Sequence, residues 1–170
     1  MKQRGFTLVE IVITVTIMSI LLTLAVVNLN SSEANARDAE RASDVKTIAN
    51  HMELYYKNGI SLSTTVGRYP STAVFNNGET SMKTFFPDID LLSVTAPGAA
   101  NAVSSFIPAT NTNQSEGGVT PQPTITQYVY QPIQTNGSLC TTEVQECRKF
   151  ALFYRSEVDN SIKKVMSKNQ

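Results

Sequence analysis

A long apolar run near the N-terminus constrains the fold of this chain more than any other feature. From Phe6 to Leu29 the only charged residue is Glu10. As a helix, this stretch is about 36 Å long at about 1.5 Å per residue, which is enough to cross a membrane core of about 30 Å. We therefore expect residues 6–30 to form a helix that spans a membrane or is buried in a comparably apolar place.

The flanking charges predict an orientation for this helix. Lys2 and Arg4 precede it, and positive charge favours keeping the N-terminus in the cytoplasm, so the rest of the chain should face outward. A secretory signal is an alternative, because Ala34-Asn35-Ala36 fits the small-x-small rule for a cut after Ala36. The apolar run is longer than the usual signal core of about 7–15 residues, however. No cysteine directly follows it, as a lipoprotein signal would require.

The carboxylate inside the apolar run needs an explanation. An ionised carboxylate deep in a bilayer costs on the order of 3 kcal/mol and usually has a partner. The simplest interpretation places Glu10 close to the membrane surface, where it stays solvated. The residues around Glu10 favour a different interpretation.

These residues resemble a known processing site. Gly5-Phe6-Thr7-Leu8-Val9-Glu10 follows a short basic leader and resembles the processing site of type IV pilins and of type II secretion pseudopilins. The resemblance implies that a membrane peptidase removes residues 1–5 by cutting between Gly5 and Phe6, and that it methylates the new amine of Phe6. Glu10 then corresponds to the glutamate that this family keeps at the fifth mature position.

The resemblance also implies a role for Glu10 in assembly. In a helical stack of subunits, each Glu10 carboxylate would meet the Phe6 amine of a neighbour already assembled. An unpaired charge in an apolar medium is costly and a paired one much less so, so this pairing favours one axial offset between subunits. Many type IVa pilins carry a glycine and a proline in this helix. The corresponding residues here are Ser19 and Val27, so we expect a straighter segment.

The helix is expected to continue past the membrane as an amphipathic segment over residues 31–58. Apolar residues recur there at steps of three and four, which predicts one buried stripe. No proline interrupts the chain before Asn58-Gly59, which supplies a helix stop. The predicted stripe consists of Ala39, Ala42, Val45, Ile48, Ala49, Met52 and Tyr55 or Tyr56.

Residues 59–170 are expected to form a loop-rich and β-sheet head. We expect the apolar pieces 84–87 and 88–92 to pin a loop onto the core, and strands over 127–131 (ending at Pro132), 149–155 and 162–166. Asp159-Asn160-Ser161 predicts a hairpin turn between the last two strands. The predicted fold class is α+β: a long N-terminal helix packed against a small C-terminal antiparallel sheet. This matches the lollipop shape of the family that the motif resembles.

The two cysteines, Cys140 and Cys147, have six residues between them. Outside the membrane they are placed to form a disulfide, and the resemblance agrees, because many pilins close a C-terminal loop in this way. Two reduced, buried thiols are the alternative. A metal site would need further ligands that do not accompany the pair.

The sequence gives little support for catalysis or ligand binding. It has one histidine, His51, and neither a nucleophile-elbow motif nor a phosphate-binding loop, so we expect no enzyme, catalytic residue, cofactor or metal. Asp88-x-Asp90 is weak evidence for a calcium ion. Lysines 163, 164 and 168 could touch DNA but more often serve solubility. The balance of 14 basic and 14 acidic residues makes no electrostatic case for nucleic acid.

The sequence interpretation is therefore a structural subunit of a type IV pilus. The precursor would wait in the cytoplasmic membrane and then join an extracellular helical homopolymer. Its partners would be other copies of itself, the prepilin peptidase and methylase, and a membrane assembly platform with a separate ATPase. The first alternative is a type II secretion pseudopilin. The others are a single-pass surface-binding protein that never polymerises and a secreted domain cut after Ala36.

Overall fold

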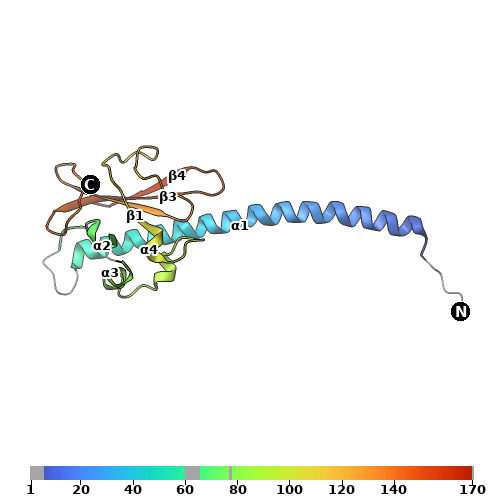
Figure 1. The fold of residues 1–170 in the computed structure, drawn as a ribbon, viewed down its shortest axis with the longest axis horizontal. Helices are drawn as coiled ribbons and strands as arrows, with labels where there is room; N and C mark the ends of the chain where they lie inside the picture. Colours follow the sequence, from blue (N-terminus) through green and yellow to red (C-terminus); the bar gives the residue numbers. More distant parts are fainter. Residues whose placement is uncertain (1–5, 60–65, 77, 170) are drawn as a thin grey trace.

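The computed structural model describes residues 6–59, 66–76 and 78–169 of the 170-residue chain. One helix, α1 (Leu8–Asn58), extends far beyond a small head formed by the rest of the chain (Figure 1). The N-terminal half of α1 projects alone, whereas its C-terminal half lies in the head. There a four-stranded sheet covers one side of α1 and short helices lie on the other (Figure 1). This α+β arrangement confirms the predicted fold class, apart from one strand described below.

Both ends of α1 follow capping chemistry. Thr7 is the N-cap, and the backbone amide of Gly59 donates to the carbonyl of Tyr55, 2.8 Å away. Gly59 has a φ of 66°, a conformation that glycine adopts without steric cost. Between these caps the backbone is helical without interruption, including at Ser19 and Val27. The helix is therefore continuous, as the sequence predicted.

The buried stripe of α1 differs from the prediction at its start. Val45, Ile48 and Met52 are fully buried, as expected. Ala39 and Ala42 are exposed, so this part of the prediction is wrong. Polar side chains, foremost that of Arg41, are buried at this level of the helix instead, because partners in the head satisfy their charges.

Arg41 joins the helix to the end of the sheet. Its guanidinium, only 1% exposed, donates to Asp38, to Glu157 and to the carbonyl of Ile125 at 2.7, 3.0 and 2.7 Å. Arg37 pairs with the same Glu157 at 2.7 Å. We call Arg37, Asp38, Arg41 and Glu157 the Arg41 cluster. Buried charges are tolerated only when paired and hydrogen-bonded, and here each member of the cluster has such partners.

The layer opposite the sheet consists of short helices that the sequence did not predict. They are α2 (Ala73–Asn76), α3 (Gly78–Phe85), the 3₁₀ helix η1 (Leu91–Val94) and α4 (Ala102–Ser105). The expectation for residues 84–87 is confirmed by Phe85 and Phe86, which are 2% and 1% exposed. In residues 88–92, Ile89 and Leu91 pack partly buried against the core, whereas Leu92 is 76% exposed, so that part of the prediction is wrong.

The sheet has the strand order β1-β2-β3-β4 and is mixed. The strands are β1 (Phe106–Pro108), β2 (Tyr128–Gln134), β3 (Cys147–Arg155) and β4 (Ile162–Met166). β2, β3 and β4 pair antiparallel, and Asn160, with a φ of 55°, lies in the predicted turn between β3 and β4. The sequence missed β1, which pairs parallel to β2. A parallel partner requires a long connection, and residues 109–127 provide one.

Strand β2 continues through Pro132, where the sequence predicted its end. Pro132 pairs with Phe150 of β3, and its carbonyl accepts a hydrogen bond from the amide of Cys140 on the other side. The amide and carbonyl of one residue point to the same side in an antiparallel pair. The hydrogen that proline lacks would therefore point away from β3, so the β2–β3 ladder loses no bond.

We predict that the contribution of Asp44 to the stability of the head rises on mild acidification. This carboxyl group is 6% exposed and accepts a hydrogen bond from Tyr128 at 2.8 Å, and its burial raises its pKa from 3.8 to about 6. A raised carboxyl pKa means that the folded state binds more protons than the unfolded state between these values. The Asp44 contribution to the free energy of unfolding therefore falls as pH rises from about 4 to about 6, by up to about 3 kcal/mol, and the lowered pKa of His51 contributes a slope of opposite sign.

Urea unfolding of the full-length protein in detergent micelles between pH 4.5 and 7 measures this slope. Asp44→Asn is the matched variant, because it keeps an acceptor for Tyr128 and removes the titration. Glu157, whose pKa the hydrogen-bonded guanidinium groups of Arg37 and Arg41 lower to about 2, weakens the head only at more acidic pH. Equal slopes in the wild type and in Asp44→Asn would contradict the prediction.

Candidate functional site

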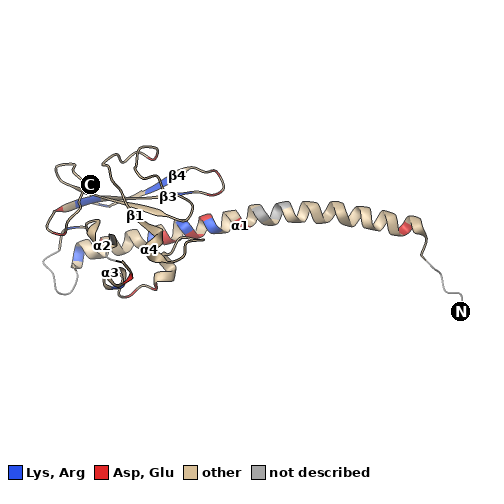
Figure 2. Ribbon diagram, in the orientation of Figure 1, with Lys and Arg blue, Asp and Glu red and all other residues tan. Residues whose placement is uncertain are grey.

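The N-terminal half of α1 is an apolar surface that the chain itself does not cover. Side chains 6–26 are all exposed, including Leu8 at 79% and Met18 at 69%. Glu10 is the only charged residue from Phe6 to Leu29, and Figure 2 shows the described part of this half of the helix in tan apart from a red position near its N-terminal end. By length and composition, α1 can cross a membrane. A surface of this size and kind requires a lipid or protein partner.

Glu10 lies at the start of this surface and closes the first turn of the helix. Its carboxylate accepts hydrogen bonds from both the backbone amide and the hydroxyl of Thr7, each at 2.8 Å. The hydroxyl of Thr7 in turn accepts the amide of Glu10 at 3.3 Å. This reciprocal pattern is a capping box. In a single chain, the carboxylate therefore turns toward the N-terminal end of the helix.

The structure places the predicted processing and assembly residues at this same end. Phe6 precedes the helix, and its side chain is 85% exposed. Glu10 points back to Thr7, the residue that follows Phe6. Gly5, the other predicted processing residue, lies outside the described residues. The sequence analysis missed the capping role of Glu10, although the Thr-x-x-Glu pattern at residues 7–10 signals it.

The hydroxyl groups within the apolar surface have partners in their own helix. Thr14, Thr16, Ser19 and Thr23 each donate to a carbonyl three or four residues earlier, at 2.7–2.9 Å. These hydroxyls therefore need no water or neighbouring chain, so the helix can enter an apolar medium without leaving them unsatisfied.

On the head, Cys140 and Cys147 form a disulfide with a Cα–Cα distance of 5.8 Å. Both cysteines are buried, and their carbonyls accept the amides of Thr72 and Tyr69. The disulfide closes a short surface loop that exposes Val144 at 85%. The two backbone hydrogen bonds to the cysteine carbonyls therefore tie this loop to the segment that follows α1.

We predict that removing this disulfide destabilises the head without unfolding α1. Closing a loop of this length contributes about 2–3 kcal/mol in the chain-entropy description. The double variant Cys140→Ser/Cys147→Ser should unfold at a lower urea concentration with an unchanged helical circular dichroism signal at low urea. An unchanged urea midpoint would show that the disulfide does not hold the head together.

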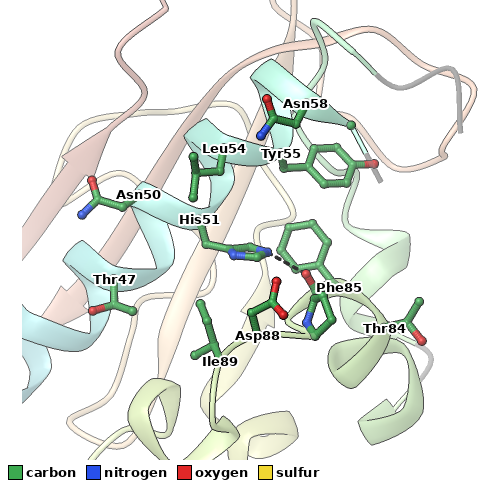
Figure 3. A pocket seen from close by; sticks show the side chains of 12 residues that line it. Thr47, Asn50, His51, Leu54, Tyr55, Asn58, Thr84, Phe85, Asp88 and Ile89 are labelled. Atoms are coloured by element: carbon green, nitrogen blue, oxygen red, sulfur yellow. Dashed lines mark hydrogen bonds between the residues drawn. The ribbon is translucent and has the colours of Figure 1, made fainter. Parts of the chain in front are cut away.

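His51 lines a cavity of about 570 Å³ between α1 and α3 (Figure 3). Its Nε2–H donates to the carbonyl of Phe85 at 2.7 Å, and its ring lies 5.2 and 4.9 Å from those of Phe85 and Phe86. Burial lowers the pKa of His51, while the hydrogen bond to Phe85 and the charge of Asp88 oppose this shift. The neutral imidazole thus fastens α3 to α1, a packing role at the boundary of the core.

The Asp88-x-Asp90 pattern does not gather further ligands. The carboxylate of Asp90 caps η1 by accepting the amide of Leu92 at 3.0 Å. Among residues 6–59, 66–76 and 78–169, no group of three or more His, Cys, Asp or Glu side chains is placed to hold a metal ion. The structure therefore adds no support for calcium at this turn.

A family model matches the same N-terminal part of the chain that carries the exposed apolar surface of α1. Residues 1–26 match the family model of the prokaryotic N-terminal methylation motif. The type II secretion system core protein G of Escherichia coli (strain K12) is 37% identical over 54 residues, which are 32% of this chain and 37% of that protein. The core protein G of Pectobacterium carotovorum subsp. carotovorum is 32% identical over 71 residues, 42% of this chain and 41% of that protein.

These matches span about two-fifths of the length of the curated relatives. No solved structure matches the chain significantly. The long helix and the small mixed sheet form an α+β, pilin-like arrangement that carries this motif at its N-terminus. Over part of its length the chain is therefore similar to pilins and pseudopilins. Its relatives favour the pseudopilin alternative over the type IV pilus that the sequence analysis preferred.

Proposed function

We propose that this protein is a structural subunit of a pseudopilus of the type II secretion kind. The observation that carries the proposal is the apolar half of α1, which is exposed on all sides and begins at the methylation motif. Before assembly the membrane covers this surface, with the N-terminus in the cytoplasm and the head outside. After assembly the same surfaces of neighbouring copies cover it.

Glu10 fixes how neighbouring subunits align. Removal of residues 1–5 creates a positively charged amine on Phe6. In a single chain, Glu10 has only the neutral donors of Thr7. A neighbour's methylated amine offers it an opposite charge, and charge-assisted hydrogen bonds are roughly twice as strong as neutral ones. The apolar surfaces supply most of the attraction, and this pairing selects one axial offset.

The proposed partners follow from the same steps. A prepilin peptidase cuts after Gly5 and methylates Phe6, and a membrane assembly platform with a separate ATPase supplies the energy for extension. The disulfide of the head suits an oxidising compartment outside the cytoplasmic membrane.

A type IV pilus subunit is the second candidate, and the disulfide-closed loop on the head favours it. Two readouts in a strain that lacks this protein separate the candidates. A pseudopilin is required for the release of secreted enzymes into the medium. A pilus subunit is required for long filaments at the cell surface, which then contain this protein.

We predict that the mature protein begins with N-methylated Phe6. Mass spectrometry of protein purified from membranes of the native host should find an N-terminal peptide that starts at this residue and carries one added methyl group. In a strain without the prepilin peptidase, the same protein should begin at Met1. A mature chain beginning at Met1 or Arg37 in the normal strain would overturn the proposal.

We predict that Glu10→Ala and Glu10→Gln both insert into the membrane but assemble poorly. Either change leaves the Phe6 amine of a neighbour buried without its opposite charge, which costs about 3–5 kcal/mol and should lower filament number by more than tenfold. Glutamine retains the capping box and removes only the charge. Thr7→Ala is the matched control, because it weakens the cap and keeps the carboxylate.

Filaments counted by electron microscopy, together with the mature mass of each variant, measure these effects. Thr7→Ala should assemble at a near-normal level. Normal assembly of Glu10→Gln would show that Glu10 acts through its cap rather than through its charge.

A further inference from the structure

The head contains a cavity of about 630 Å³ whose lining residues all carry hydrogen-bond donors. It lies at the C-terminal end of α1, beside the start of β3 and the residues that follow β4. Three of its lining side chains are cations and none is a carboxylate. The lining residues are Tyr56, Thr135, Arg148, Lys149, Lys168 and Asn169.

The three cations are not equally available to a ligand. Arg148 donates to the carbonyl of Gly67 at 2.7 Å and to the carboxylate of Glu146 at 2.9 Å. In the part of the chain that the structure describes, Lys149 and Lys168 have no recorded ion-pair partner. Among the described residues, these two lysines beside the cavity therefore have no counterion.

The nearest carboxylates already have other partners. Glu146 pairs with Arg148. Glu53 accepts the hydroxyl of Tyr69 at 3.1 Å and the backbone amide of Lys168 at 2.8 Å. Neither carboxylate lines the cavity.

The structure also separates lysines that the sequence grouped together. Lys163 pairs with Asp159 at 3.4 Å, and Lys164 donates to the carbonyl of Gln114 at 3.1 Å. Both lie on β4, whereas Lys168 follows that strand and lines the cavity with Lys149. The lining of this cavity therefore comes from three parts of the chain that are distant in sequence.

We propose that this cavity binds the phosphate group of a small phosphomonoester. The guanidinium of Arg148, a group that binds carboxylate or phosphate with two parallel hydrogen bonds, is already engaged by Gly67 and Glu146, so the two lysines supply the charge available to a ligand. Lysine binds phosphate as a point charge, and the hydroxyls of Thr135 and Tyr56 add donors at the same cavity. The volume falls within the range of small-molecule sites, about 300–1,000 Å³, so the phosphate can carry an organic group.

Calorimetric titration of the full-length protein in nonionic detergent tests the site with three probes: inorganic phosphate, AMP and adenosine. We expect AMP to bind and adenosine not to bind. Tighter binding of AMP than of inorganic phosphate identifies an organic phosphate as the ligand, and equal binding identifies free phosphate. The absence of AMP binding at millimolar concentration, or equal binding of adenosine, would overturn the proposal.

Lys149→Gln and Lys168→Gln should each weaken AMP binding about tenfold, the equivalent of one charge-assisted hydrogen bond of about 1.4 kcal/mol. Lys163→Gln is the matched control, because it removes an exposed lysine of β4 outside the cavity. The urea midpoint of each variant verifies that its head is folded. If all three variants bind like the wild type, or weaken equally, the cavity is not the site.

Discussion

The rest of the structure depends on one constraint: half of a 51-residue helix has no cover within its own chain. Burial of apolar surface contributes roughly 25 cal/mol per Å², so α1 gains a large free energy from any environment that removes these side chains from water. The hydroxyls of Thr14, Thr16, Ser19 and Thr23 do not oppose the transfer, because they bond to the helix backbone. Glu10 is the exception, and its single-chain partner is neutral.

The C-terminal half of α1, in contrast, packs against the head and holds the head to the helix. Apolar packing does this from Val45 to Met52, but the Arg41 cluster does it where the helix enters the head. Breaking a buried ion pair by removing one partner typically costs about 3–5 kcal/mol. Because Arg41 contacts both Ile125 and Glu157, the cluster joins the helix to two loops of the sheet at once.

The sequence predicts the parts of this fold that depend on repeating local patterns. An uninterrupted apolar run and an amphipathic stripe are enough for α1, and alternating β-rich runs are enough for β2 to β4. It does not predict β1 or Arg41, because their environment comes from residues far away in the chain. Pro132 makes the predicted end of β2 wrong, because the effect of a proline depends on which side of the strand its missing N–H would face. The resemblance to the processing motif predicts an assembly role for Glu10, whereas the hydrogen bonds between Glu10 and Thr7 can be predicted from the Thr-x-x-Glu spacing alone.

A cryo-electron microscopy structure of assembled filaments tests the central claim most directly, because it shows what covers the apolar half of α1. The account predicts that side chains 8–26 of each subunit are buried against neighbouring helices. It also predicts that the Glu10 carboxylate lies within hydrogen-bond distance of the methylated Phe6 nitrogen of an adjacent subunit. A filament in which these helices stay exposed, or in which that carboxylate and that amine lie far apart, would contradict it.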